Sequence, residues 1–192
     1  KNAYSVDGKH LLNRLKELGQ TGRDENGVLS RLEATEEEKA GRDAFVSWIK
    51  EAGLEVKVDR IGNIFGIWQD EDNKNQAPIM VGSHIDSVEN AGIYDGCYGV
   101  ISGLEVIQSL KEQGYKSPRP LVVGAFTNEE GSRFQPDMLG SLVYVGGLDV
   151  DEALKTVAID GAILGEELEK IGYAGSEEPG FIKPHAFVEL HV

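Results

Sequence analysis

The chain has 192 residues, 40% of them hydrophobic, which is enough for one sizeable core and too short for two comfortable domains. The formal net charge of −14 argues against nucleic acid or an anionic membrane as a partner, because both bind clustered Lys and Arg. A single cysteine allows no internal disulfide, no apolar run approaches the ~18 residues of a membrane helix, and the N-terminus lacks a signal-peptide core, all of which fits a soluble cytoplasmic protein.

The first part of the chain predicts two helices and then two strands. Residues 8–19 form an amphipathic helical pattern, with four leucines on its inner face: Leu11, Leu12, Leu15 and Leu18. Thr35 is a typical cap for a second helix, which has acidic residues in its first turn and ends at Gly53. Residues 54–69 alternate or run apolar, so we expect two strands joined by a turn near Gly62 and Asn63.

In the rest of the chain, short apolar strands alternate with helical patterns. Strands are predicted at residues 77–84, 119–127 and 185–192, and helices at residues 99–114, 137–147, 150–158 and 160–173. This alternation predicts a three-layer α/β/α domain around a mostly parallel central sheet.

Polar side chains capable of chemistry follow three of the predicted strands. His84, the pair Glu129 and Glu130, and His191 each lie at or just beyond a strand end, and Asp95 lies in a glycine-flanked turn before a helix. In open α/β sheets, sites form beyond the carboxyl ends of strands. We therefore expect these five side chains to converge at one edge of the sheet.

Each of these features also has a simpler interpretation. A lone histidine at a strand end is usually hydrogen-bonded or exposed to solvent, and an Asp-Gly pair alone is a turn. Cys97 lies beside the glycine-rich turn, but the sequence singles out no partner base for a thiolate, so we interpret it as a packing residue. The glutamates of residues 33–39 and 165–170 are interpreted as helix N-terminal and solvent-face charges.

Several segments together resemble a known enzyme family. They are "GRDAFVSWIKEAGLEVKVDRIGNIFG", "GSHIDSVENAGIYDGCYGVISGLEVI", "FTNEEGSRF" followed by "MLGS", and the final "ELHV". In this order they resemble the amidases of hydantoinase/carbamoylase type within the M20 metallopeptidase-like superfamily. Members of this family include N-carbamoyl-L-amino-acid hydrolases, ureidopropionases and allantoate amidohydrolases.

The resemblance implies a site with two divalent metal ions. The roles that it implies are these: His84 and His191 bind the first ion, Glu130 binds the second, Asp95 bridges both, Glu129 is the general base, and Asp86 supports the His84 side. A ligand set of His, Asp and Glu without Cys suits Zn²⁺, Mn²⁺, Co²⁺ or Ni²⁺ and does not choose among them.

The resemblance also implies an activity, which is cleavage of a linear amide or ureido C–N bond in a small molecule, first of all in an N-carbamoyl-L-amino acid. Allantoate amidohydrolase and an M20-type aminopeptidase are the alternatives within enzymes, and a non-catalytic fragment without a working metal site is the alternative from another class. The family's lid and dimerisation domain and its last histidine ligand are absent from this chain. We therefore expect residues 1–192 to be a single, incomplete catalytic domain of a homodimeric enzyme, and to be inactive alone.

Overall fold

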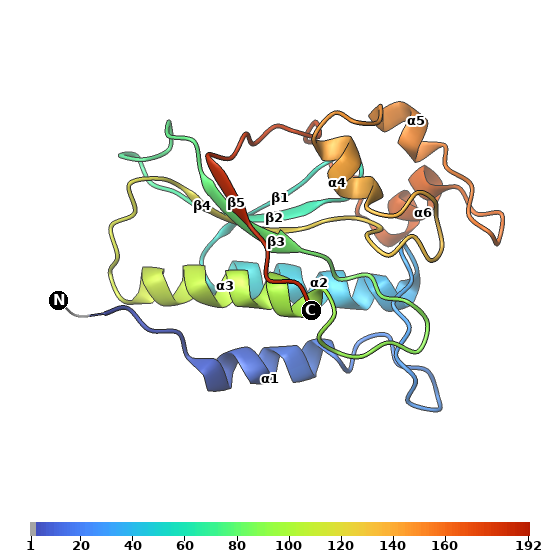
Figure 1. Cartoon of the computed structure of the whole chain (residues 1–192), viewed down its shortest axis with the longest axis horizontal. Helices are drawn as coiled ribbons and strands as arrows, with labels where there is room; N and C mark the ends of the chain where they lie inside the picture. The colour runs from blue at the N-terminus through green and yellow to red at the C-terminus, as the bar shows by residue number, and fades with distance from the viewer. Residues whose placement is uncertain (1–2) are drawn as a thin grey trace.

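The computed structural model describes residues 3–192 and contains a five-stranded mixed sheet (Figure 1). The strands lie in the order β1-β2-β4-β3-β5, with these bounds: β1 Glu55–Val58, β2 Ile64–Trp68, β3 Ile79–Ser83, β4 Leu121–Ala125 and β5 Ala186–Val188. β2 is antiparallel to its neighbours β1 and β4, whereas β3 is parallel to β4 and β5. All strands except β2 therefore run in one direction, which confirms the mostly parallel sheet.

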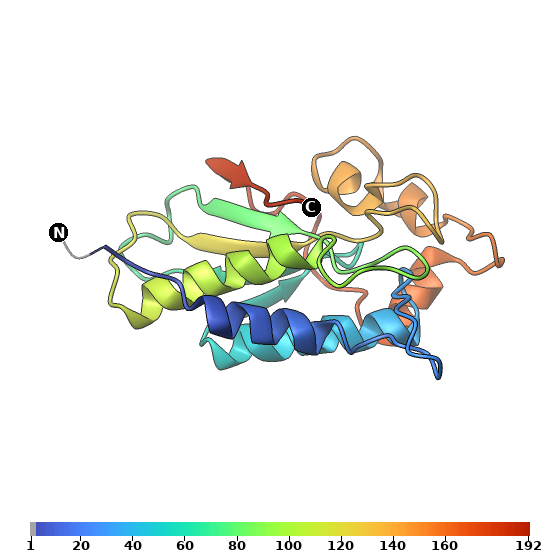
Figure 2. The ribbon, with the colours of Figure 1, turned by 60° about the horizontal axis from the view of Figure 1, so that its bottom comes forward.

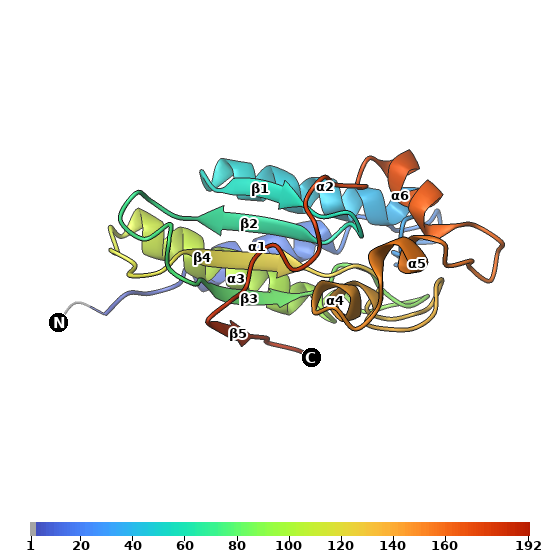
Figure 3. The same ribbon diagram turned by 90° about the horizontal axis from the view of Figure 1, so that it is seen from above.

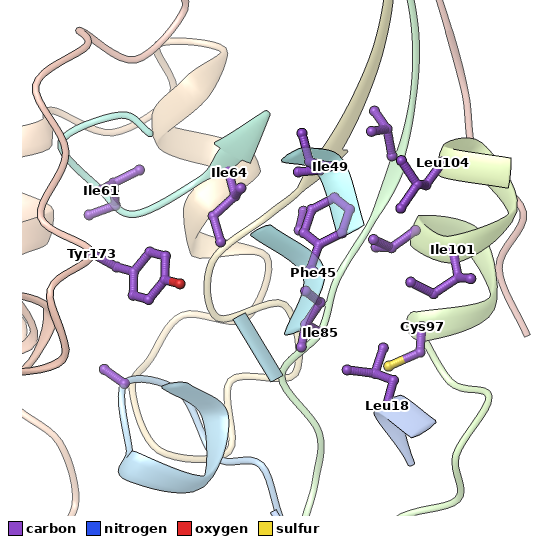
Figure 4. Packing of buried hydrophobic residues seen from close by; sticks show 14 of the residues in the cluster. Leu18, Phe45, Ile49, Ile61, Ile64, Ile85, Cys97, Ile101, Leu104 and Tyr173 are labelled. Carbon is purple, nitrogen blue, oxygen red and sulfur yellow. The ribbon is translucent and has the colours of Figure 1, made fainter. Parts of the chain in front are cut away.

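Three helices lie on one side of the sheet: α1 (Gly8–Leu18), α2 (Glu36–Glu51) and α3 (Cys97–Glu112). α2 and α3 lie next to the sheet, and α1 packs outside them (Figures 1 and 2). Figure 4 shows how Phe45 and Ile49 of α2 and Ile101 and Leu104 of α3 meet in the apolar core between helices and sheet. Burial of these side chains is the main force that holds the helices on this face.

The opposite face of the sheet is covered differently. The short helices α4 (Leu139–Tyr144), α5 (Val150–Leu154) and α6 (Leu164–Ile171) gather at one end of the sheet, and the irregular chain before β5 crosses the strands (Figure 3). Phe181 and Ile182 of this crossing segment pack with Tyr144 against Phe65 and Met80 of the sheet. The α/β class is confirmed, and an irregular segment with α4 forms the third layer.

Two details differ from the sequence-based expectation. Leu12 is 48% exposed, because α1 touches its neighbours along a narrower stripe that buries Leu15 and Leu18. The last strand ends at Val188, where its pairing with Val81 of β3 ends, instead of continuing to Val192. Among residues 3–192, no helix has the length and apolar character needed to cross a lipid bilayer.

Candidate active site

The carboxyl ends of β3, β4 and β5 meet at the same edge of the sheet (Figure 3). His84 directly follows β3, Glu129 and Glu130 lie shortly after β4, and His191 lies shortly after β5. Asp95 reaches the same place from the turn that precedes α3. The structure thus brings together all five side chains for which convergence was expected, while their roles as ligands or base stay predictions.

The polar atoms of these side chains surround a small space. His84 Nε2 lies 3.4 Å from each of three atoms, namely Asp95 Oδ1, Glu129 Oε2 and His191 Nε2. His191 Nε2 lies 3.2 Å from Asp95 Oδ1. Ligand atoms of His84, Asp95 and Glu130 form a second group within 4.8 Å of one another. The two groups of donors therefore overlap, because both contain His84 and Asp95.

The spacing of the first group fits a divalent ion. Ligands at ~2.0–2.1 Å from a tetrahedral ion are separated from one another by about 3.3–3.4 Å. The three separations among His84, His191 and Asp95 are 3.2–3.4 Å, and all three donors are nitrogen or oxygen atoms that suit Zn²⁺ and similar ions. These residues therefore fit a metal ion without rearrangement of the backbone.

His84 is held in one orientation. Its ring is fully buried, and Nδ1–H donates to the backbone oxygen of Asp86 at 2.8 Å, which leaves Nε2 facing the site. Burial alone lowers the pKa of His84, but the hydrogen bond and the charge of Asp86, together with the charge of Glu129, outweigh it and raise the pKa to about 9. In the absence of a cation, His84 is therefore an imidazolium at neutral pH.

A glycine allows the turn with Asp95 to approach this ring. Gly96 has φ of +71°, and a Cβ at this position would lie 2.5 Å from ring atoms of His84. Any side chain here would both strain the backbone and displace the imidazole. Because Gly96 has no side chain, the backbone of this turn can contact the His84 ring closely.

Asp86 connects the two sides of the site. Its Oδ1 lies 3.5 Å from His84 Nδ1, and its two carboxylate oxygens accept the backbone N–H groups of Glu129 and Glu130, each at 3.1 Å. The Asp86 side chain is itself buried. It therefore fixes the loop after β4 relative to the end of β3.

The two adjacent glutamates have different surroundings. Burial raises the pKa of Glu129, while the charge of His84 opposes this rise. Burial, followed by the charge of Asp95 and a shared hydrogen bond with it, raises the pKa of Glu130 to about 7. Glu129 thus faces His84, whereas Glu130 and Asp95 crowd together in a way that a cation would relieve.

A cavity of about 460 Å³ opens beside the site. Glu129, Glu189 and His191 contribute to its polar end, and Phe126 and Phe187 to its apolar wall. The cavity gives a small molecule access to the same atoms that surround the proposed ion position.

Comparison with known proteins identifies the family. The model of Peptidase family M28 matches residues 63–180. The crystal structure of an amidase of the hydantoinase/carbamoylase family from Burkholderia multivorans superposes with a TM-score of 0.94 at 44% identity, covering 100% of this chain and 46% of that one. The chain belongs to the hydantoinase/carbamoylase family of amidases. The sequence motifs suggested the M20 label for the wider group, whereas the family model that matches carries the M28 label.

Curated relatives of this chain also carry the names of hydrolases that act on C–N bonds. An N-carbamoyl-L-amino acid amidohydrolase of Geobacillus stearothermophilus is 39% identical over 97% of this chain and 46% of the relative. A ureidoglycolate hydrolase of Arabidopsis thaliana is 35% identical over 100% of this chain and 42% of the relative. The chain thus spans less than half the length of these curated relatives.

The amidase fold also uses residues that the sequence analysis missed. Glu33 and Glu38 were interpreted as helix N-terminal and solvent-face charges. Glu38 does lie in the first turn of α2, but exposure to solvent was wrong for both, since they are only 2% and 1% exposed. Both lie 2.6 Å from nitrogen atoms of Arg42, whose charge offsets part of the cost of their burial. The four-residue spacing between Glu38 and Arg42 on one helix was the available signal for this pair.

Glu189 is a second residue of the amidase site without a sequence-based prediction. Its Oε2 accepts a hydrogen bond from Ser83 Oγ at 2.7 Å and lies 3.7 Å from His191 Nδ1. A carboxylate behind the far nitrogen of a ligand histidine typically sets the orientation of the ring. Ser83, at the end of β3, thus tethers the chain on which His191 lies.

Cys97 matches its interpretation as a packing residue. The thiol is fully buried, and Arg31 Nη2 donates to its sulfur at 3.0 Å. Burial raises the pKa of the Cys97 thiol, although the charge of Arg31 opposes this. A buried neutral thiol is a poor nucleophile, which removes Cys97 from the candidate catalytic residues.

Proposed function

We propose that the whole protein is a dinuclear-metal amidohydrolase that cleaves the ureido C–N bond of N-carbamoyl-L-amino acids. The observation that carries this proposal is the cage of donor atoms around His84 Nε2, with separations of 3.2–3.4 Å, at the mouth of a cavity. The names of the relatives support the ureido bond, since an N-carbamoyl amino acid and ureidoglycolate each carry a ureido group next to a carboxylate.

His84 and His191 would hold the first ion, Glu130 the second, and Asp95 both. The candidates are Zn²⁺, Mn²⁺, Co²⁺ and Ni²⁺, because all four accept nitrogen and oxygen ligands of this kind. When bound, such ions supply Lewis acidity that polarises the carbonyl oxygen of the substrate. The backbone oxygen of Asp86 keeps His84 in the tautomer that presents Nε2, and the Glu189 carboxylate lies 3.7 Å from Nδ1 of His191 on the other side.

Glu129 is the proposed general base. Its carboxylate borders the cavity and faces the donor cage, and its raised pKa makes it a better proton acceptor than an exposed glutamate. It takes the proton of the attacking water and returns it to the leaving nitrogen. Water and the N-carbamoyl amino acid then give the free amino acid, ammonia and carbon dioxide.

The nearest alternative is another ureido substrate, either allantoate or ureidoglycolate, and the name of the Arabidopsis relative favours ureidoglycolate. The aminopeptidase and non-catalytic alternatives have less support, because the donor cage suits a metal ion and the similar proteins carry amidohydrolase names. The homodimer, the small-molecule partner and the cytoplasmic location expected from the sequence stay predictions.

Ammonia release from a set of substrates tests the proposal. The whole protein, loaded separately with Zn²⁺, Mn²⁺, Co²⁺ or Ni²⁺, is assayed for ammonia with N-carbamoyl-L-amino acids, allantoate and ureidoglycolate. A dipeptide is assayed separately for free amino acids, because its hydrolysis releases no ammonia. We expect metal-dependent release from the N-carbamoyl compounds, abolished by a chelator and restored by metal. Faster turnover of allantoate or ureidoglycolate would replace the proposed substrate, and absence of both metal and turnover would favour the non-catalytic alternative.

A further inference from the structure

The loop after β4 is held by side chains along its whole backbone. Four successive N–H groups, from Thr127 to Glu130, donate to oxygen atoms of other segments. The acceptors are Asn63 Oδ1 at 2.8 Å for Thr127, Glu33 Oε2 at 3.1 Å for Asn128, Asp86 Oδ1 at 3.1 Å for Glu129 and Asp86 Oδ2 at 3.1 Å for Glu130. Asn63, Glu33 and Asp86 are all buried. We call these three residues the loop clamp.

The backbone of this loop needs such acceptors. β4 ends at Ala125, so the N–H groups of residues 127–130 have no partner strand. Asn128 has a positive φ of 55°, a conformation that residues with a side chain rarely adopt. A buried N–H without an acceptor is costly, and a strained residue persists only where its surroundings hold it. The loop clamp meets both requirements.

Among the three residues of the loop clamp, Glu33 is the one that connects the loop to Arg42 of α2. Its Oε2 accepts the Asn128 N–H, while its Oε1 lies 2.6 Å from Arg42 Nη2. Arg42 is anchored in turn by Glu38 at 2.6 Å and by the backbone oxygen of Gly62 at 2.5 Å. A continuous chain of charge-assisted hydrogen bonds therefore runs from α2 through Glu33 to the residue next to Glu129.

We propose that Glu33 is a positioning residue, which, with Arg42 behind it, directs the side chains of Glu129 and Glu130 into the donor cage. The effect on turnover rests on the proposed function, whereas the effect on the loop and on metal affinity does not depend on turnover. Glu33 touches no substrate or metal position and acts only through the backbone at Asn128.

The chain offers a matched control for Glu33. Glu38 is a buried glutamate that also pairs with Arg42 at 2.6 Å, but its other partner is the backbone N–H of Ala34 and none of the N–H groups of residues 127–130. Both Glu33→Gln and Glu38→Gln weaken the ionic contact with Arg42. Only Glu33→Gln leaves one oxygen to serve two donors, Arg42 and Asn128, that the carboxylate satisfied with two oxygens.

The experiment is titration of the 192-residue chain and both variants with Co²⁺, whose visible absorption reports the arrangement of ligands. We expect Glu33→Gln to weaken Co²⁺ binding about 10- to 100-fold, the range for residues that orient metal ligands, and to change the absorption bands. Glu38→Gln should keep the bands and a nearly unchanged affinity, even where thermal unfolding shows the same loss of stability. Equal losses in both variants, in proportion to their stability, would overturn the positioning role.

Amide hydrogen exchange in the unaltered chain tests the clamp without any variant or metal. We expect the N–H groups of Asn128, Glu129 and Glu130 to exchange as slowly as those of β4, although they lie in a loop. Rapid exchange at Asn128 would overturn the proposal. Because this measurement uses the unaltered chain, it decides the question even if Glu33→Gln fails to fold. Failure of the unaltered chain to bind Co²⁺, together with slow exchange, would instead contradict the proposed metal site and leave the clamp supported.

Discussion

Metal binding to this chain should depend strongly on pH, because His84 must lose a proton before it can act as a ligand. The pKa of His84 is raised to about 9, so that the ring is protonated at pH 7 when no cation is present. Its Nδ1–H is bonded to the Asp86 backbone oxygen, and the proton that a metal ion displaces is therefore the one on Nε2. Lower pH favours the protonated ring and weakens metal binding.

The size of the effect follows from the distance between the assay pH and this pKa. Well below pH 9, each pH unit lowers the apparent affinity about tenfold, or about 1.4 kcal/mol. Half of the rings are already protonated at pH 9, so the His84 proton alone makes binding at pH 7 about 50-fold weaker than at pH 9. Glu130, with a pKa of about 7, adds a second displaced proton and a steeper dependence below pH 7. Above pH 9 the affinity should become constant.

Isothermal titration with Mn²⁺ under argon measures both the affinity and the protons released. At pH 8, titrations in buffers of different ionisation enthalpy should show close to one proton released for each ion bound. Asp86→Asn is the companion variant: without the carboxylate charge, the pKa of His84 falls and the slope between pH 7 and 9 becomes smaller. An affinity that is flat between pH 7 and 9, without proton release, would refute this account of His84.

Four further outcomes are expected. Glu129→Gln in the whole protein should lower turnover by about 10²–10⁴-fold with metal content nearly intact, measured by ammonia release and metal analysis, since Gln keeps the shape and loses the proton acceptor. Asp95→Ala should instead lower metal occupancy, and unchanged occupancy would exclude Asp95 as a ligand. Gly96→Ala should weaken metal binding because its Cβ would displace the His84 ring, with Gly92→Ala, where nothing lies within 4 Å, as the control. Burial raises the pKa of Asp59 to about 7, against an ordinary value of 3.8. Between these two pH values the native state binds more protons than the unfolded state. The stability that this protonation contributes is therefore lost as the pH rises from about 4 to 7. Urea unfolding at pH 5 and 8 should therefore show that the stability of Asp59→Asn rises relative to that of the unaltered chain at the higher pH. A difference in stability that is the same at both pH values would contradict the raised pKa.

The sequence predicted correctly those features of the site that depend on residues adjacent to one another along the chain. Apolar runs marked β3 and β4, and the first polar residues after such runs in an α/β sheet lie at its carboxyl edge. For this reason His84, Glu129 and Glu130 could be assigned to one edge before any coordinates. The Asp95-Gly96 turn could be added because a glycine-flanked turn just before a helix lets the backbone bring a carboxylate to the same edge.

Features that depend on contacts between distant segments could not be read in this way. Glu33 and Glu38 lie among four glutamates within six residues. Apart from the four-residue spacing of Glu38 to Arg42, nothing local separates them from Glu36 and Glu37, which stay at the surface. The burial of Glu33 and Glu38 depends on contacts with Arg42 and, for Glu33, with the loop after β4. The end of β5 likewise lies where its pairing with β3 ends, at Val81 and Val188, and the residues of β5 alone do not indicate this point.

The donor cage has one rigid side and one loosely held side. His84 is fully buried behind β3, whereas His191 is 41% exposed and follows an edge strand of three residues, all exposed, that pairs with β3 alone. Such a strand belongs to the part of a structure that opens locally at low free-energy cost. A ligand that binds both sides stabilises the closed form by mass action. Metal concentration should therefore control how often the end of the chain detaches from the sheet, and added metal should slow proteolytic cleavage between β5 and His191.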